Sequence, residues 1–198
     1  MIEPTRIDPA RARLYRDSGA WAGETLSARF SRSARAAPSD VALIDEASFT
    51  FAELDSLSSS LAAALRKCGV GPGDTVSMQL PNWWEAAVVL LGASKIGAVL
   101  NPLQMIYRQG ELRFILRQNG SKALIVPHAF RGFDYGAMAL EVAAALPDPP
   151  LVISVRGPGG IRFEDLLKAT SGEPAIVDRK STRLNSSHPS KSRMPSSA

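Results

Sequence analysis

Short apolar runs and longer amphipathic stretches follow one another along this chain in a repeating order. The short runs, which predict strands, lie at residues 41–44, 48–51, 75–80, 98–100, 122–126 and 151–155. The longer stretches, which predict helices, lie at residues 25–36, 54–68, 82–96, 111–119 and 135–146. Strands and helices that alternate several times are typical of right-handed βαβ units. The sequence therefore predicts an α/β fold, in which alternating βα units form a mostly parallel sheet flanked by helices.

Two pairs of polar residues carry local signals for the start of a helix. Thr50 and Glu53 have the spacing of a capping box, in which the hydroxyl accepts from the N3 amide and the carboxylate accepts from the N-cap amide. Asn82 and Glu85 have the same spacing and predict the start of the next helix. That helix, at residues 82–96, is apolar almost all round, so it is predicted to be buried.

The composition is that of an ordinary globular protein. Of the 198 residues, 45% are hydrophobic and 21% are charged, and a chain of this size forms a core without disulfide or metal support. The longest apolar run, at residues 86–93, is far shorter than the ~20 residues of a membrane span. The polar start of the chain predicts no secretory signal, and the single cysteine, Cys68, excludes a disulfide framework. We therefore expect a cytoplasmic protein.

The net charge of +4 comes entirely from the C-terminal tail. Residues 178–198 hold five basic side chains and one acidic one, whereas residues 1–177 hold eighteen of each. The body therefore lacks the basic excess that is typical of nucleic-acid binding, and we predict no nucleic-acid partner. The tail has too few apolar residues to form a core, so we predict that it is disordered.

The tail also resembles a translated sequencing adapter. DRKSTRLNSSH at residues 178–188 and SRMPSSA at residues 192–198 match two blocks of such an adapter in the correct order. We therefore expect the natural reading frame to be cut near Val177, and a genuine flexible basic tail is the alternative. The resulting division is an N-terminal arm with a helix at residues 1–40, a partial α/β subdomain at residues 41–177, and a disordered, adapter-derived tail at residues 178–198.

Three glycine-containing segments are candidates for a phosphate-binding loop, which follows a strand and precedes a helix. Residues 69–73 have the opposite order, and Pro72 removes an amide, so they predict a helix end and a turn. Residues 156–160 follow a strand, but no Lys or Ser/Thr follows at phosphate-loop spacing and the next helix opens with acids. Residues 170–172 precede a glutamate and a proline, which disfavour phosphate. All three segments are predicted to be turns or helix ends.

The remaining candidates for chemistry are isolated side chains. Cys68 has no histidine near it in sequence and is predicted to be a small buried apolar residue. His128 follows a strand at the edge where α/β sheets bind ligands, but a lone histidine is more often solvated or structural. His188 lies in the tail. Trp83 and Trp84 are predicted to anchor a helix to the sheet, with a stacking platform as the alternative. We therefore assign no catalytic, cofactor-binding or metal-binding residue.

The order of several segments and their amino-acid sequences resemble the N-terminal part of the AMP-forming acyl-CoA synthetase and acid–thiol ligase superfamily, the adenylate-forming enzymes. The segments that carry this resemblance are ALI at 42–44, FTFAEL at 49–54, LAAALRKCGVGPGDTV at 61–76, LPNWWE at 80–85, KIGAV at 95–99 and YRQGELRFIL at 107–116. Together they indicate similarity over residues 21–155. RGFDY at residues 131–135 is most similar to coenzyme A ligases for medium-chain, carbocyclic or aromatic acids.

The resemblance implies a two-step reaction that uses ATP, Mg²⁺ and coenzyme A. The carboxylate of a small acid attacks ATP to give an acyl-adenylate and pyrophosphate, and a thiol then takes the acyl group. The family's phosphate loop, adenine- and ribose-binding motifs, acyl pocket and C-terminal lysine match no segment of this sequence. The chain is therefore expected to be an incomplete N-terminal subdomain that is inactive alone. The alternative is a standalone, non-catalytic α/β module that binds a partner through an exposed sheet face.

Overall fold

The computed structural model describes residues 8–170, which belong to two compact units. The described residues up to Glu24 form one unit, with helix α1 (Pro9–Asp17) and a ring contact between Tyr15 and Trp21 at 5.2 Å. The α/β body begins at Thr25 and includes α2 (Leu26–Ala36), although the division expected from the sequence placed this helix with residues 1–40. The sequence pattern did not predict α1, because it holds few apolar residues. The tail proposed for residues 178–198 lies outside the described residues.

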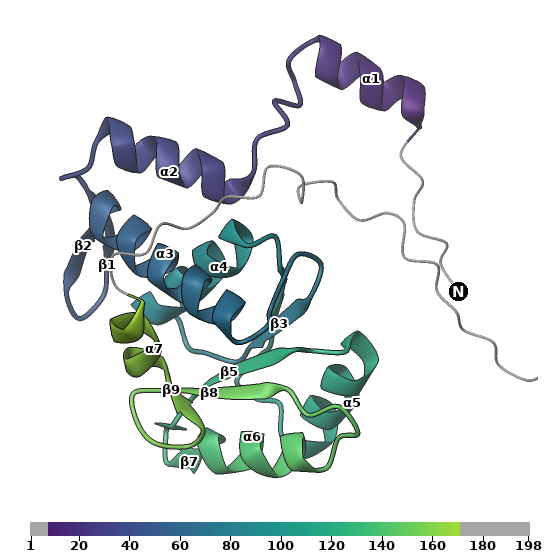
Figure 1. Cartoon of the computed structure of the whole chain (residues 1–198), viewed down its shortest axis with the longest axis vertical. Coiled ribbons are helices and arrows are strands. Elements are labelled where there is room, and N and C mark those ends of the chain that lie inside the picture. The colour runs from purple at the N-terminus through teal and green to yellow at the C-terminus, as the bar shows by residue number, and fades with distance from the viewer. Residues whose placement is uncertain (1–7, 171–198) are drawn as a thin grey trace, which may run out of the picture. The chain divides into compact units, whose positions relative to one another are not determined.

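The body is built on a sheet whose five described strands run parallel, in the order β4-β3-β5-β8-β9 (Figure 1). These strands are β3 (Thr75–Met78), β4 (Val99–Pro102), β5 (Ala123–Pro127), β8 (Leu151–Val155) and β9 (Ile161–Arg162). The predicted α/β fold with a parallel sheet is confirmed. The short edge strand β9 was not predicted, since two residues give no periodic signal.

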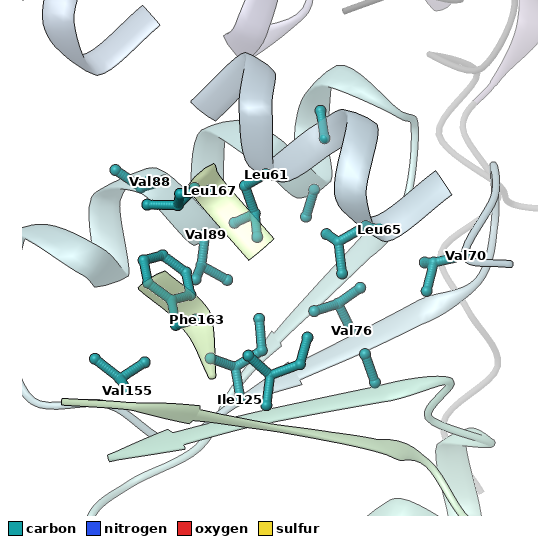
Figure 2. Packing of buried hydrophobic residues seen from close by; sticks show 14 of the residues in the cluster. Leu61, Leu65, Val70, Val76, Val88, Val89, Ile125, Val155, Phe163 and Leu167 are labelled. Atoms are coloured by element: carbon teal, nitrogen blue, oxygen red, sulfur yellow. The ribbon is translucent and has the colours of Figure 1, made fainter. Parts of the chain in front are cut away.

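Helices cover both faces of this sheet (Figure 1). They are α3 (Phe51–Lys67), α4 (Trp84–Lys95) and α7 (Phe163–Ala169) on one face, and α5 (Gln109–Asn119) and α6 (Tyr135–Ala144) on the other. Side chains alternate between the faces along each strand, so Ile125 joins one core cluster while Leu124 and Val126 join the other. Figure 2 shows Leu61 of α3 and Phe163 of α7 converging above Ile125. Strand β5 is buried throughout, as parallel sheets require.

Two short hairpins complete the described body. β1 (Val41–Ile44) pairs antiparallel with β2 (Ser48–Thr50), as the sequence predicts, and β6 (Ala129–Phe130) pairs with β7 (Phe133–Asp134) after β5. The capping box between β2 and α3 is confirmed. The Glu53 amide donates to Thr50 Oγ1 at 3.2 Å, and the Thr50 amide donates to Glu53 Oε2 at 2.7 Å. The backbone amide and the hydroxyl of Thr50 both lower the pKa of Glu53.

A helix does start near Asn82, but the predicted cap formed by Asn82 and Glu85 is wrong. The N-cap of α4 is Trp83, which supplies no capping side chain. Asp45 from the β1–β2 hairpin accepts instead from the Trp84 amide, at 3.0 Å from its Oδ2. A carboxylate distant in sequence thus replaces the local cap, and Glu85 is left to bind another partner.

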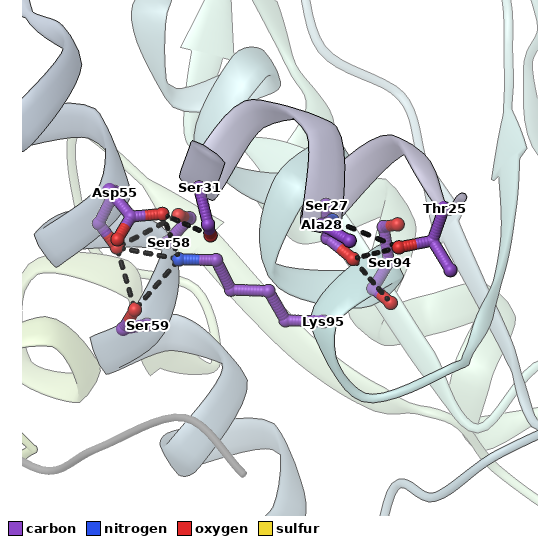
Figure 3. Close-up of polar contacts among 9 residues, drawn as sticks. All are labelled: Thr25, Ser27, Ala28, Ser31, Asp55, Ser58, Ser59, Ser94 and Lys95. Atoms are coloured by element: carbon purple, nitrogen blue, oxygen red, sulfur yellow. Dashed lines mark hydrogen bonds and ion pairs between the residues drawn. The ribbon is translucent and has the colours of Figure 1, made fainter. Parts of the chain in front are cut away.

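A buried lysine ties α3 to α4, and a serine of α2 joins the same group (Figure 3). The Lys95 side chain is 1% exposed, and its Nζ donates to Asp55 Oδ1 at 2.8 Å, to the Asp55 carbonyl at 2.7 Å and to Ser59 Oγ at 2.7 Å. Ser31 Oγ of α2 donates to the same Asp55 oxygen at 2.7 Å. Burial lowers the pKa of Lys95 against the opposing effect of Asp55. All three ammonium hydrogens therefore have acceptors.

The order of the strands fixes where a ligand site is expected. From β3 the chain adds β4 on one side and then returns to add β5 on the other, so the switch point lies between β3 and β5. In open α/β sheets, ligands bind beside the carboxyl ends of the strands at such a point. The residues that follow β3 and β5 are therefore the first place to search.

Candidate functional site at the carboxyl edge of the sheet

Arg156 is the centre of the charged groups at the carboxyl edge. It follows β8, and its Nε and Nη2 donate to the two carboxylate oxygens of Glu85 at 2.6 and 3.1 Å. Its Nη1 donates to Glu46 Oε1 at 2.8 Å, and Asp45 Oδ2 lies 3.9 Å from Nη2. Bidentate pairing of this kind is strong and directional. Arg156 thus joins the end of β8 to α4 and to the β1–β2 hairpin.

The surroundings of Arg156 hold its charge and its backbone in place. Its hydrogen bond to Glu85 is the main cause that raises the pKa of Arg156. The backbone has φ 61°, a left-handed conformation that non-glycine residues seldom adopt. The Arg156 amide donates to Glu164 Oε1 at 2.8 Å, so a carboxylate of α7 provides the acceptor for the backbone N–H of the turn. The site carries more carboxylates than cations, which disfavours phosphate.

Two aromatic rings meet across the switch point. Trp83, which follows β3, contacts Phe130 in the β6–β7 hairpin after β5, with ring centroids 5.8 Å apart in an edge-on arrangement. The Arg156 guanidinium lies over the Trp83 ring, 4.0 Å from its centroid. Trp84 faces the other way, packing on Phe49 and Phe163. Both tryptophans pack against the core cluster, as residues that anchor a helix do. The aromatic rings that they contact lie in the two hairpins and in α7, however, and not in the five-stranded sheet to which they were predicted to anchor the helix.

His128 lies at the carboxyl end of β5, beside the 157–160 turn. A Cβ on Gly157 would come within 2.6 Å of the imidazole Cδ2, so the turn packs directly on the ring. A Cβ on Gly160 would lie 2.5 Å from the Val152 carbonyl. The glycines at these two positions therefore permit the turn to pack closely on His128 and β8. His128 Nδ1 is buried and has no hydrogen-bond partner among the described residues.

The other candidates lie away from the carboxyl edge. Residues 69–73 form the end of α3 and a turn, as predicted, with φ 84° at Gly69. Cys68 is exposed, so the prediction that it is buried is wrong: it is the C-cap of α3, and its neighbours Lys67 and Gly69 are exposed as well. Thr170 ends α7 and donates to the Ser60 carbonyl at 2.7 Å. Residues 171–172 and His188 lie outside the described residues.

Nothing in residues 8–170 groups three or more His, Cys, Asp or Glu side chains into a possible metal site. Within the same residues, no helix is long and apolar enough to cross a membrane. The Arg156 cluster was missed in the sequence because its partners stand 71 and 110 residues away, where no spacing rule applies.

Comparisons with known proteins place this fold. The parallel sheet with helices on both faces matches the apo structure of MbtA from Mycobacterium smegmatis with a TM-score of 0.74 and 30% identity, over 88% of this chain and 32% of that one. The model of the family described as AMP-binding enzyme matches residues 30–192. The chain therefore belongs to the AMP-binding enzyme family, and the resemblance noted in the sequence is confirmed.

Two relatives show the range of the family. The chain is 36% identical over 139 residues to 2-hydroxy-7-methoxy-5-methyl-1-naphthoate–CoA ligase of Streptomyces carzinostaticus, covering 69% of this chain and 25% of the ligase. It is 33% identical over 147 residues to medium-chain fatty-acid–CoA ligase of Escherichia coli strain K12, covering 73% of this chain and 26% of that enzyme. The chain thus spans about a quarter of the length of these relatives.

Proposed function

We propose that this chain is the N-terminal part of an AMP-forming acid–thiol ligase. The observation that carries the proposal is the match of the AMP-binding enzyme model to residues 30–192, supported by the fold shared with MbtA. The relatives named above are both CoA ligases. The chain would then contribute the first parallel sheet of a larger enzyme.

The proposed reaction has two balanced steps. A carboxylate oxygen attacks the α-phosphorus of ATP, the bond between the α- and β-phosphates breaks, and pyrophosphate leaves with its charge held by Mg²⁺. The thiol sulfur of coenzyme A then attacks the acyl carbon of the acyl-adenylate, the thiol proton passes to solvent, and the bond between the acyl carbon and the phosphate oxygen breaks, which releases AMP. Both steps need donors aimed at developing negative charge. The carboxylate-rich edge around Arg156 is unsuited to that task.

We assign the described residues a supporting role in this reaction. The carboxyl edge is closed by its own contacts: Arg156 pairs with carboxylates, the 157–160 turn packs on His128, and Trp83 packs on Phe130. The adenylation groups would come from polypeptide that the relatives have in addition to the part matched here. The 198-residue chain alone is therefore proposed to be inactive. The larger ligase is proposed to be cytoplasmic.

For the acid, we propose an aromatic or medium-chain carboxylic acid. This proposal is supported by the names of the two relatives, because one is a naphthoate–CoA ligase and the other is a medium-chain fatty-acid–CoA ligase. The RGFDY segment at residues 131–135 supports the same range.

The test uses the natural locus. The gene is sequenced past the codon for Val177, the longer polypeptide is expressed, and ATP–pyrophosphate exchange is measured with aromatic and medium-chain acids. We expect acid-dependent exchange with at least one acid, followed by thioester formation when coenzyme A is added. A longer polypeptide that exchanges pyrophosphate with none of them would contradict the proposal, and a natural stop codon at this point would favour the non-catalytic module.

A further inference from the structure

A four-residue turn follows the edge strand β4. Leu103 continues from β4 and donates its amide to the Met78 carbonyl at 2.7 Å. The Tyr107 amide then donates to the Gln104 carbonyl at 3.2 Å, which closes the 104–107 turn. Ile106, one of the two central residues of this turn, is 73% exposed. The turn therefore presents a large apolar side chain to solvent.

Three side chains from different parts of the body hold the carbonyls of the 104–107 turn. Gln79, which follows β3, donates from Nε2 to the carbonyls of Gln104 and Tyr107 at 2.8 and 3.1 Å. Tyr135 of α6 donates its hydroxyl to the Met105 carbonyl at 2.6 Å. Arg108 donates from Nη1 to the carbonyls of Met105 and Tyr107 at 2.7 and 2.9 Å. Side chains from both sides of the switch point therefore fix one turn.

The groups that fix the turn are themselves rigid. Gln79 is fully buried and Tyr135 is 2% exposed, while the Arg108 guanidinium lies over the Phe133 ring at 4.2 Å. Ile106 is thus presented by a turn whose conformation is already set. A side chain that is ordered before binding loses little conformational entropy when it docks.

We infer that Ile106 is a docking residue, and that its partner is the polypeptide by which ligase relatives exceed this chain. The inference rests on the proposed function. Two observations support this occupant: the chain covers only 25% and 26% of the two relatives, and the turn lies on the β4 side of the sheet, where β4 pairs only with β3 among the described strands. Val99 of β4 is 50% exposed, so the same side of the sheet is left uncovered. The partner surface would be apolar, to match the isoleucine side chain.

Thiol labelling tests the docking of Ile106. In a Cys68→Ser background, Ile106→Cys is prepared in the 198-residue chain and in the longer polypeptide from the natural locus, and the rate of maleimide modification is measured. We expect labelling to be at least ten-fold slower in the longer polypeptide. The matched control is Gln118→Cys, at an exposed position on α5, with one rate expected in both polypeptides.

Equal rates at position 106 would overturn the docking inference, and so would protection that grows with the concentration of the 198-residue chain, which would identify a second copy as the partner. Pyrophosphate exchange is measured on the same longer polypeptide. If the longer polypeptide catalyses pyrophosphate exchange but position 106 is not protected, the docking inference is contradicted and the proposed function is not. Protection without exchange supports the docking and contradicts the proposed chemistry.

Discussion

The Lys95 and Arg156 clusters are both built on an ion pair, but they place the buried charge on opposite partners. At Lys95 the cation is buried, with its side chain 1% exposed, whereas the side chain of its partner Asp55 is 31% exposed. At Arg156 the anion is buried, since the Glu85 side chain is 3% exposed while that of Arg156 is 26% exposed. A buried charge is costly when its partner is removed, because neither water nor a counter-charge replaces it. Removing the partner of the buried charge should therefore destabilise the protein in both clusters, but the pH at which stability recovers should be high for one and low for the other.

The clusters also differ in what they connect. The Lys95 cluster joins helices α2, α3 and α4 on one face of the sheet. The Arg156 cluster joins the carboxyl end of β8 to α4 and to the β1–β2 hairpin. The first thus lies within the helical layer, whereas the second lies at the edge at which an α/β sheet binds ligands. The Arg156 guanidinium at this edge already pairs with carboxylates of the fold.

The largest expected effect is that of Asp55→Ala, which leaves the Lys95 ammonium buried without its counter-charge. We expect the free energy of unfolding to fall by about 3 kcal/mol at neutral pH. Stability should recover as the pH rises, because deprotonation removes the stranded charge. Urea unfolding at pH 7 and pH 10 measures both quantities. Asp148→Ala, at an exposed position, is the control, and an equal loss in the two variants would refute the buried-cation account.

A smaller loss is expected for Arg156→Met, which leaves the Glu85 carboxylate buried. We expect a loss of about 2 kcal/mol, less than for Asp55→Ala because Arg156 is itself partly solvated. This variant should regain stability as the pH falls, since protonation of Glu85 removes the charge. Adding Glu85→Gln to Arg156→Met should restore part of the loss. If the stability of Arg156→Met recovered at high pH and not at low pH, the assignment of Glu85 as the buried charge would be wrong.

The wild-type protein should show a weaker pH dependence from Lys95. Burial lowers the pKa of Lys95 in the folded state below its ordinary value of 10.5. Between the folded and the unfolded pKa the unfolded chain binds more protons, so stability should rise as the pH increases through this window. Chemical unfolding between pH 7 and pH 10.5 measures the slope. Lys95→Met should flatten it, and an unchanged slope in that variant would exclude Lys95 as its source.

The smallest effect belongs to the capping box at the start of α3. Hydrogen bonds from Thr50 lower the pKa of Glu53 below 4.5, so its stabilising contribution is present above that pH and is lost as the pH falls through the folded pKa. Glu53→Gln should make the unfolding midpoint less sensitive to pH between 5 and 2. Glu141→Gln, at an exposed position on α6, is the matched control. A similar change in the pH sensitivity of both variants would show that the capping box is not its source.

Local signals predicted much of the fold, and contacts distant in sequence account for most of what they missed. Periodicity found the four longer strands of the sheet and the five longer helices of the body, though not the short α7, and the Thr50–Glu53 spacing located the start of α3. The same spacing at Asn82 and Glu85 misled, because Asp45 caps α4 and Glu85 binds Arg156. Polar residues alternate with apolar ones from Thr75 to Leu80, which was a usable sign that Gln79 faces a polar environment. Its bonds to the 104–107 turn had no sequence signal.

We propose that this chain is a folded part of an AMP-forming ligase and has no adenylation chemistry of its own. The most direct measurement is pyrophosphate release by the purified 198-residue chain with ATP, Mg²⁺ and a panel of aromatic and medium-chain acids. Circular dichroism confirms that the protein is folded in the same samples. The account predicts release equal to that of a sample without protein. Acid-dependent release above that level would contradict it, and would show that these residues contain a phosphate site.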